Sequence, residues 1–533
     1  MARLSWRLWP LLAAGLLAAA PLSALADSLP RVTANSNVTG QDKRPAREHS
    51  TPFVLTDPNN PQRIFVAEEE LRTRSCELHV SHDGGRTWNT APGNPLPPAF
   101  QFCTANSGYI ALPMAWAKDG ALLLAMYGLR PQDNDVFSGR ASIVLSRTTD
   151  EGKSWQSTIV RDNRASDPLE GAWQVHMASD TAHDRVFVGW MAFVKMQGKN
   201  VRRAEMAISS DGGKTFGSPI DMTGVPAGVS TTNAIVIDRA GPSLAVSPDG
   251  VPFLLYYAFT VPSDPKVNKR PAVGLFAATT PDLGKTVQTY LVQKPSDFLG
   301  FPELGVAPLK SGGFALVAIF EDLASDPAAA QQQVRDIFVR RSTDGGKSWS
   351  DRKRITDDPP GGFFNKYTPQ IATAPNGRLD AAWYDFRNDN GALLSDVYYT
   401  NSTDGGLNWA PNMRVSDAQS NRHYGNFAHY SDVRGPLGIG ATNYGAFVAW
   451  DDSRNANALT ESQDVYFGAV QLAALPPPSE NAWLAYAAAA GLGLAVAALL
   501  LLAASMALRR RRAPGAGAAP PTPVREQAPA LTR

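Results

Sequence analysis

Ionisable and nucleophilic side chains gather in the second half of this chain, next to the ends of predicted strands. The candidate site residues are Glu303, Tyr367, Asp385, Arg387, His423, Tyr430, Asp452 and Arg454. Carboxylates can transfer protons, and arginines can bind anions through paired hydrogen bonds. A site that hydrolyses or binds a glycan needs side chains of these types, and we expect them at one mouth of a central channel.

Two pairs among these candidates also have a structural explanation. The segment Trp383-Tyr-Asp385-Phe-Arg387-Asn388 matches Trp450-Asp-Asp452-Ser-Arg454-Asn455. Because the two Asp-x-Arg pairs occupy equivalent positions, charge-assisted hydrogen bonds between neighbouring units would explain them as well as a site would.

Two further polar groups contain residue types that could form a site. Glu68, Glu69 and Glu70 form a run that we interpret as a solvated charge run. His423 and His429, with Asp432 nearby, lack the tight ligand spacing of a metal centre. The sequence therefore predicts neither a metal nor a cofactor.

The elements that must position these residues are copies of one unit. Five segments share an aspartate, a glycine-containing turn and an aromatic residue: Ser81-His-Asp83-Gly-Gly-Arg-Thr-Trp88, Thr148-Thr-Asp150-Glu-Gly-Lys-Ser-Trp155, Ser209-Ser-Asp211-Gly-Gly-Lys-Thr-Phe216, Ser342-Thr-Asp344-Gly-Gly-Lys-Ser-Trp349 and Ser402-Thr-Asp404-Gly-Gly-Leu-Asn-Trp409. A sixth, Thr280-Pro-Asp282-Leu-Gly-Lys-Thr-Val287, lacks the aromatic. The aspartates recur every 60 to 71 positions, which indicates a repeat fold.

Each segment is predicted to be a hairpin turn, because a strand with period-2 alternation precedes it and another begins at the aromatic. The aspartate can accept hydrogen bonds from backbone N–H groups of its own turn, glycine supplies a positive φ, and the aromatic covers the open end. These residues resemble the Asp box (BNR repeat) of the sialidase superfamily. We expect the turns themselves to be structural.

Four antiparallel strands per unit are typical of a β-propeller blade. A seventh unit lacks the Asp box and has three strands. Its missing outer strand is expected from the start of the mature chain, where Arg31-Val32-Thr33 is similar to Arg414-Val415-Ser416 at the end of unit six. The sequence thus predicts an all-β, seven-bladed β-propeller with Asp-box hairpins, closed by its two ends.

The family resemblance implies a location and a chemistry for the site. In sialidase-like propellers the ligand lies on the face opposite the Asp boxes, and a tyrosine nucleophile assisted by a glutamate acts with an aspartic acid/base and three arginines. Tyr367 or Tyr430 with Glu303 would form the first pair, and Arg387 and Arg454 two of the clamp residues. The chain departs from the pattern, since no Phe/Tyr-Arg-Ile/Leu-Pro segment occurs near the first blade and sialidases have six blades.

Two functions are compatible with this pattern. The first is a membrane-anchored, sialidase-like glycoside hydrolase outside the cytoplasm, and the second is a non-catalytic propeller that binds a glycan or a protein partner. A shared fold does not decide between them. If Arg387 and Arg454 are each paired with neighbouring carboxylates, no clamp for sialic acid remains and the binding function is favoured.

Both ends of the chain carry targeting signals. Arg3 and Arg7, an apolar run and Ala24-Leu25-Ala26 predict a signal peptide over residues 1–26, with an uncleaved anchor as the alternative. The propeller is then expected over residues 27–475 and a proline-rich linker over 476–481. The uncharged residues 482–508 predict a transmembrane helix rather than a core helix, which would show a polar stripe. The arginines after it place the disordered tail, 509–533, in the cytoplasm.

Charge and cysteine content describe the exported part further. The formal net charge of the chain is +1, but the leader and the tail hold the excess of arginines, so the exported part carries about −6. Binding to nucleic acid is therefore not expected. The two cysteines, Cys76 and Cys103, both lie in this part, and an oxidising compartment predicts a disulfide between them, with two buried thiols as the alternative.

Overall fold

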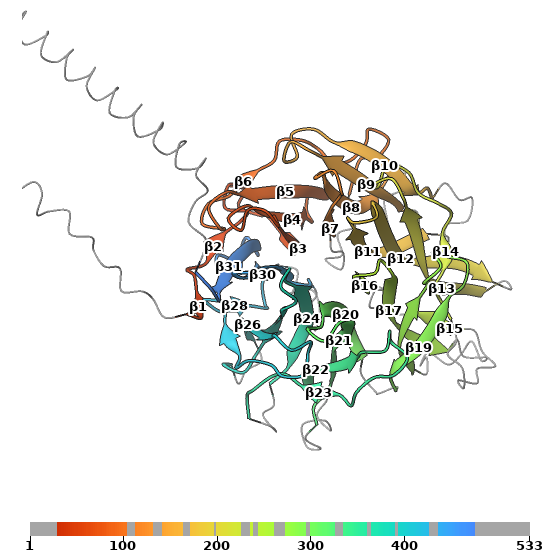
Figure 1. Ribbon diagram of the computed structural model, residues 1–533. Coiled ribbons are helices and arrows are strands. Elements are labelled where there is room, and N and C mark those ends of the chain that lie inside the picture. Colours follow the sequence, from red (N-terminus) through yellow and green to blue (C-terminus); the bar gives the residue numbers. More distant parts are fainter. Residues whose placement is uncertain are drawn as a thin grey trace, which may run out of the picture. The chain divides into compact units, whose positions relative to one another are not determined.

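A computed structural model describes residues 29–103, 112–131, 141–163, 171–196, 199–224, 235–237, 243–260, 272–294, 299–325, 334–359, 364–389, 393–425 and 435–474. These residues form 31 strands and no helix. The strands make seven antiparallel sheets arranged as blades around a common axis (Figure 1). The predicted all-β, seven-bladed β-propeller is therefore confirmed.

Blades 1 to 3 each have an innermost strand, two central strands and an outer strand, and blade 4 has a second inner strand because β15 and β16 both pair with β17. Blade 1 contains β3 (His49–Thr56), β4 (Ile64–Glu70), β5 (Ser75–Ser81) and β6 (Asn89–Thr90); blade 2 contains β7 (Met114–Trp116), β8 (Leu122–Gly128), β9 (Ser142–Thr148) and β10 (Gln156–Arg161); blade 3 contains β11 (Gly171–Asp180), β12 (Arg185–Met196), β13 (Lys199–Ser209) and β14 (Ile220–Asp221); blade 4 contains β15 (Ile235–Ile237), β16 (Ser243–Val246), β17 (Pro252–Thr260), β18 (Ala272–Thr279) and β19 (Gln288–Gln293).

The last three blades follow the same plan. Blade 5 contains β20 (Leu299–Pro308), β21 (Phe314–Leu323), β22 (Arg335–Ser342) and β23 (Lys353–Arg354); blade 6 contains β24 (Lys366–Thr373), β25 (Leu379–Asp385), β26 (Leu394–Ser402), β27 (Met413–Arg414) and β28 (Ser420–Asn421); blade 7 contains β29 (Gly438–Thr442), β30 (Gly445–Asp452), β31 (Asp464–Gln471), β1 (Arg31–Val32) and β2 (Ser36–Asn37).

The two ends of the propeller close the ring in blade 7. The first strand, β1, pairs antiparallel with the last, β31, with Arg31 opposite Gln471 and Val32 opposite Val470. The predicted outer strand near Arg31 is thus confirmed. Closure removes the free sheet edges that an open array would expose.

Apolar packing occurs between blades rather than in one shared core. The described residues form seven large clusters of buried apolar side chains, and each joins two neighbouring blades. Trp190 lies in the cluster between blades 2 and 3, and Trp383 lies in the cluster between blades 5 and 6. Each blade therefore depends on both neighbours for burial of its two faces.

The aspartate turns add polar contacts to this packing. In blade 6, the Asn408 N–H and the Ser402 hydroxyl donate to Asp404 Oδ1 at 2.9 and 2.8 Å. Gly406 has a φ of +88°, and a Cβ there would lie 2.7 Å from Val317 of blade 5. Only glycine satisfies both the positive φ and this close approach. The turns are structural elements that hold one blade against the preceding one.

Two expectations for blade 1 have opposite outcomes. Cys76 at the start of β5 forms a disulfide with Cys103, as predicted. The expectation that Glu68, Glu69 and Glu70 form a solvated run is wrong, because all three are fully buried. They belong to β4, where pairing with β3 and β5 removes them from solvent.

The segments predicted to be a signal peptide, a linker, a transmembrane helix and a cytoplasmic tail lie outside the described residues. The chain divides into two units, residues 1–474 and 475–533. Among the described residues, no helix is long and apolar enough to cross a membrane.

Candidate functional site

Residues from all seven blades line a cavity at the centre of the ring. Beside other lining residues such as Gln174, each blade contributes one residue at an equivalent position: Phe53, Pro113, His176, Ser243, Glu303, Gln370 and Gly438. Six are paired with equivalent positions of the second strand of their blade, and Pro113 accepts a hydrogen bond from the equivalent Ala125 N–H. We call this set the channel ring. The cavity has a volume of about 160 Å³.

A repeated β-bulge directs several of these side chains into the channel. The register of the first strand shifts immediately before Phe53, His176, Glu303 and Gln370. Bulges of this kind re-aim the side chain that follows them. The backbone of the bulge is held by the preceding blade, as where Glu321 Oε1 accepts the Thr368 N–H at 2.6 Å.

The channel ring has a polar arc and an apolar arc. Four consecutive blades, 3 to 6, supply His176, Ser243, Glu303 and Gln370, whereas blades 7, 1 and 2 supply Gly438, Phe53 and Pro113. A ligand with a hydroxyl-rich side and a C–H side would match both arcs.

Glu303 is the centre of the polar arc. The Ser243 hydroxyl donates to Glu303 Oε2 at 2.6 Å, and Gln370 Nε2 donates to Oε1 at 3.3 Å. Ser243 Oγ also accepts the Leu304 N–H at 3.1 Å. The carboxylate is therefore oriented by side chains from both neighbouring blades, which is the preorganisation that binding and catalytic sites require.

His176 adds an uncharged donor and acceptor to this arc. Burial lowers the pKa of His176, and the negative charge of Glu303 partly opposes the shift. A lowered pKa keeps the imidazole neutral at pH 7, with one nitrogen as donor and the other as acceptor. Within the described residues, no hydrogen bond to the ring of His176 is present.

Of the residues predicted from sequence, Glu303 lines the cavity, whereas Arg387 and Asp385 lie in an ion pair in blade 6. Arg387 Nη2 is 2.8 Å from Asp385 Oδ2, and Nη1 is 2.7 Å from Asp357 in the connection from blade 5. Trp383 Nε1 donates to the same Asp385 oxygen at 2.9 Å. These contacts match the structural explanation for the pair.

Blade 7 repeats this arrangement with Asp452 and Arg454. Arg454 Nη2 lies 2.8 Å from Asp452 Oδ2, and Nη1 reaches Asp417, in the connection from blade 6, at 2.5 Å. Trp450 Nε1 donates to Asp452 Oδ2 at 2.9 Å. Neither arginine lines the cavity, and both are engaged by carboxylates of their own surroundings.

The structure does not bring the other predicted residues into the cavity. Tyr367 is buried in the core between blades 6 and 7, with its ring edge-on to Phe386 at 5.6 Å between centroids. His423 is exposed. Tyr430 lies outside the described residues. Catalytic roles for these residues remain predictions.

Sequence reasoning missed His176, Ser243 and Gln370. A signal exists for two of them, because Ser243 and Gln370 directly follow a proline, as Phe53 and Glu303 do. His176 follows Val175 and has no such signal.

Comparisons with known proteins give similarities at low identity. No family model and no curated protein matches the chain. A solved structure of a protein of unknown function from Dyadobacter fermentans is 15% identical, with 83% of this chain and 99% of that chain covered and a TM-score of 0.43. A Hadza microbial sialidase is 14% identical, with coverage of 77% and 76% and a TM-score of 0.43. An α-L-arabinofuranosidase from Fusarium graminearum is 13% identical, with coverage of 73% and 99% and a TM-score of 0.43.

Proposed function

We propose that this propeller binds a glycan by inserting one sugar unit into its central channel. The observation that carries the proposal is the channel ring itself, in which an oriented carboxylate, an amide, a hydroxyl and a neutral imidazole face an apolar arc. Sugars present hydroxyl groups at their rim and C–H groups on their faces. Because the cavity has a volume of only about 160 Å³, we expect one sugar unit to enter rather than a longer chain.

Binding is preferred over hydrolysis because of the carboxylate count. Most glycoside hydrolases need two carboxyl groups at a defined separation. Among the described residues that line the cavity, Glu303 is the one carboxylate. The arginines that would clamp sialic acid are engaged in ion pairs with Asp385 and Asp452. Hydrolysis is therefore the second outcome of the experiment rather than the proposal.

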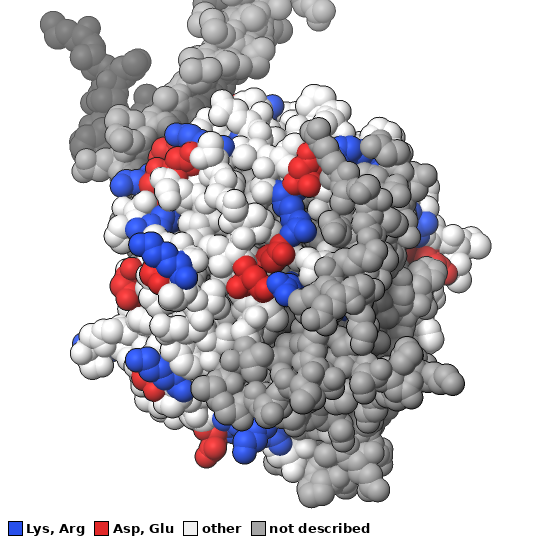
Figure 2. All heavy atoms as spheres, turned by 90° about the vertical axis from the view of Figure 1, so that its right-hand side faces the viewer, with Lys and Arg blue, Asp and Glu red and all other residues white. Residues whose placement is uncertain are grey.

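The surface charge supports recognition at the channel rather than by long-range attraction. Figure 2 shows acidic and basic side chains lying next to one another on the described part of one side of the molecule. Ion pairs such as that of Arg147 with Asp119, at 2.6 Å, mix the two signs. Interspersed charges do not create the single-sign field that steers a highly charged partner.

The experiment uses full-length protein in detergent, a glycan array, and titration calorimetry of the tightest ligand. Glu303→Gln keeps the shape of the side chain but removes its charge, and we expect the affinity to fall at least about tenfold. Glu151→Gln, a partly exposed carboxylate outside the cavity, is the matched control and should bind normally. Absence of any glycan ligand, or equal affinity of the two variants, would overturn the proposal.

The same preparation tests hydrolysis. Wild-type protein is incubated with fluorogenic glycosides that carry the sugar found on the array. We expect no release of the fluorophore above the rate seen with Glu303→Gln. Turnover by the wild type that disappears in this variant would show a glycoside hydrolase instead of a binding protein.

We also propose that the propeller is exported and anchored in a membrane by residues 482–508. The leader, the uncharged segment and the arginines after it support this location, and the Cys76–Cys103 disulfide fits an oxidising compartment. Truncation after residue 475 should move the protein from the carbonate-washed membrane pellet to the exported soluble fraction. Recovery of both forms in one fraction would contradict the anchor.

A further inference from the structure

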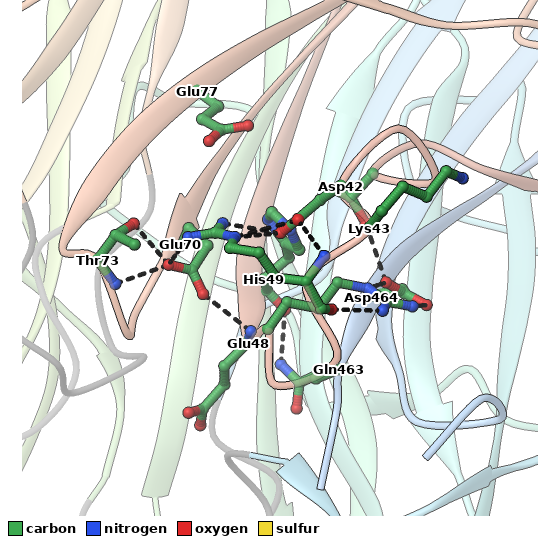
Figure 3. Close-up of polar contacts among 12 residues, drawn as sticks. Asp42, Lys43, Glu48, His49, Glu70, Thr73, Glu77, Gln463 and Asp464 are labelled. Carbon is green, nitrogen blue, oxygen red and sulfur yellow. Dashed lines mark hydrogen bonds and ion pairs between the residues drawn. The ribbon is translucent and has the colours of Figure 1, made fainter. Parts of the chain in front are cut away.

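A cluster of buried acidic and imidazole groups lies in blade 1, away from the channel ring. It comprises His49 at the start of β3, Glu68 in β4, and Glu77 and His79 in β5. The strand register places these side chains on one face of the blade, since Glu68 is directly opposite Glu77, and His49 is opposite Glu70. Figure 3 shows this part of blade 1 beside Gln463 and Asp464 of blade 7. The cluster therefore lies where the ring closes.

The two glutamates have histidines as their basic partners. No lysine or arginine of the described residues forms an ion pair with Glu68 or Glu77, and their ion-pair partners are His49 and His79. Glu68 has no exposed surface, and the Glu77 side chain is 28% exposed. Like charges directly opposite each other in a sheet are destabilising, and buried carboxylates need compensation. Protonated histidines or a bound metal ion would supply it.

The geometry offers three ligand atoms that converge. One ligand atom each from His49, Glu68 and Glu77 lies within 4.8 Å of the other two. His49 Nδ1 is 3.1 Å from Glu68 Oε2. Because Glu77 is partly exposed, an ion could enter from its side without disruption of the buried strands.

The ring of His49 is oriented from its other nitrogen. Nε2 lies 3.1 Å from Asp42 Oδ2, and a histidine that ligates a metal usually donates its second N–H to a carboxylate in this way. A neutral imidazole has a single N–H. If Nε2 donates to Asp42, then the lone pair of Nδ1 faces the Glu68 carboxylate, and a positive charge must lie between them.

Glu68 is oriented in a comparable manner. His79 Nε2 is 3.2 Å from Glu68 Oε1, and His79 Nδ1 is 3.1 Å from the Thr90 hydroxyl. With Thr90 as donor to Nδ1, the Nε2–H donates to Glu68. Each of the two buried ligands, His49 and Glu68, therefore has a hydrogen-bond partner that orients it, as ligands in metal sites usually have.

We propose that His49 Nδ1, Glu68 and Glu77 bind one divalent transition-metal ion of the zinc class at the interface between blades 7 and 1. Imidazole nitrogen combined with carboxylate oxygen suits zinc better than calcium or magnesium, which prefer oxygen ligands alone. The ion would join three strands of blade 1 next to the strand that closes the ring.

The first experiment measures zinc binding by the full-length protein. The protein is treated with a chelator, dialysed, and titrated with Zn²⁺, with bound zinc measured by mass spectrometry and thermal unfolding followed in parallel. We expect one equivalent of zinc per chain and an unfolding temperature that rises with the zinc concentration, because an ion that binds only the folded state stabilises it. Failure to bind zinc would overturn the proposal and leave a proton between His49 and Glu68.

Variants decide whether the bound zinc is at this site. Glu77→Gln changes the partly exposed ligand, so the fold should persist, and we expect the affinity for zinc to fall by more than about 100-fold. Asp42→Asn changes only the outer partner and should weaken binding about tenfold. His82→Gln is the matched control, since His82 is in the same blade with a side chain that is 56% exposed. Equal zinc affinity of the wild type and Glu77→Gln would overturn the assignment.

Discussion

One position of the second strand is occupied by a charged side chain in blade 1 and by an aromatic side chain in blades 6 and 7. In blades 6 and 7 this position holds Trp383 and Trp450, each paired across the sheet with a tyrosine. In blade 1 it holds Glu68, paired with Glu77. All three side chains are almost completely buried.

The difference shows what the repeated blade requires and what it leaves free. The backbone register is the same in the three blades, so the strand does not depend on an aromatic core at this point. Glu68 is instead surrounded by His49 and His79, whereas each tryptophan donates its indole N–H to an aspartate two residues later. A repeat fold can therefore convert one apolar layer into a polar centre without a change of topology.

Removal of the tryptophan at this position should cause the largest loss in the free energy of unfolding. Trp450→Ala removes a large side chain from the core and leaves the acceptor Asp452 without its indole donor, so we expect a loss of about 3–5 kcal/mol in the free energy of unfolding. Chemical denaturation measures it. Leu459→Ala, at a residue that is 97% exposed, is the control. A loss below about 1 kcal/mol would mean that the blade interface does not depend on this layer.

The aspartate turns should behave alike in blades that differ at the tryptophan position. Asp344→Ala and Asp83→Ala each remove acceptors for the turn, and we expect each to cost about 1–3 kcal/mol without a change in glycan affinity. Thermal unfolding and calorimetry on the same samples separate the two effects. Unchanged stability with lost binding in either variant would show that the turns belong to the ligand site.

A buried carboxyl at the closure provides a pH test. Burial raises the pKa of Asp451 to about 8, although the Ser50 hydroxyl and the Thr51 N–H, at 2.6 and 3.0 Å, act in the opposite direction. Between about pH 4 and 8 the folded state holds a proton that the unfolded state has lost. Stability should therefore fall as the pH rises through this range, by at most about 1.4 kcal/mol per pH unit.

Asp451→Asn should remove this component of the pH dependence. The amide can accept from the Thr51 N–H and donate to Ser50, so the fold should persist. Asp417→Asn, at a half-exposed carboxylate, is the control and should retain the wild-type slope. The expectation fails if the slopes of unfolding free energy against pH for wild type and Asp451→Asn coincide.

The ion pair of blade 6 should have the smallest effect. Arg387→Lys keeps the charge but loses the forked geometry toward Asp385 and Asp357, and we expect a loss of about 1 kcal/mol in stability. Glycan affinity should not change, because the side chain does not line the cavity. A tenfold loss of affinity at normal stability would restore the clamp role predicted from sequence.

Much of the fold could be predicted because the recurring sequence segments show which strands of the different units are equivalent. The spacing of the aspartate turns identifies six blades, and the match of Trp450–Asn455 to Trp383–Asn388 identifies the seventh. The similarity of Arg31-Val32 to Arg414-Val415 identifies the closing strand. The disulfide could be predicted because the chain has two cysteines, and both lie in the segment that is expected to be exported. The burial of Glu68 could not be predicted in this way, since a run of three glutamates is polar on its own, and only the pairing with β3 and β5 brings histidines to it.

The site was harder to predict than the fold for a geometric reason. Glu303 was found because it is ionisable, whereas Ser243 and Gln370 are common surface residues whose position relative to a β-bulge decides where they point. Arg387 and Arg454 have the side-chain type that could bind a carboxylate ligand. Each, however, forms an ion pair with an aspartate in a connection between blades, Asp357 or Asp417. Residue type alone does not distinguish an arginine that faces a channel from one that joins two loops.

The pairing of β1 with β31 means that the propeller has no obligatory first blade. Since Arg31 lies opposite Gln471, a short peptide could join the two ends of this ring. New termini could be opened at an exposed turn such as that of Pro375 and Asn376 between β24 and β25. Such a circular permutant would have every strand in its native neighbourhood while its termini leave the ring from blade 6. The order of blades along the gene is thus separable from their order around the axis.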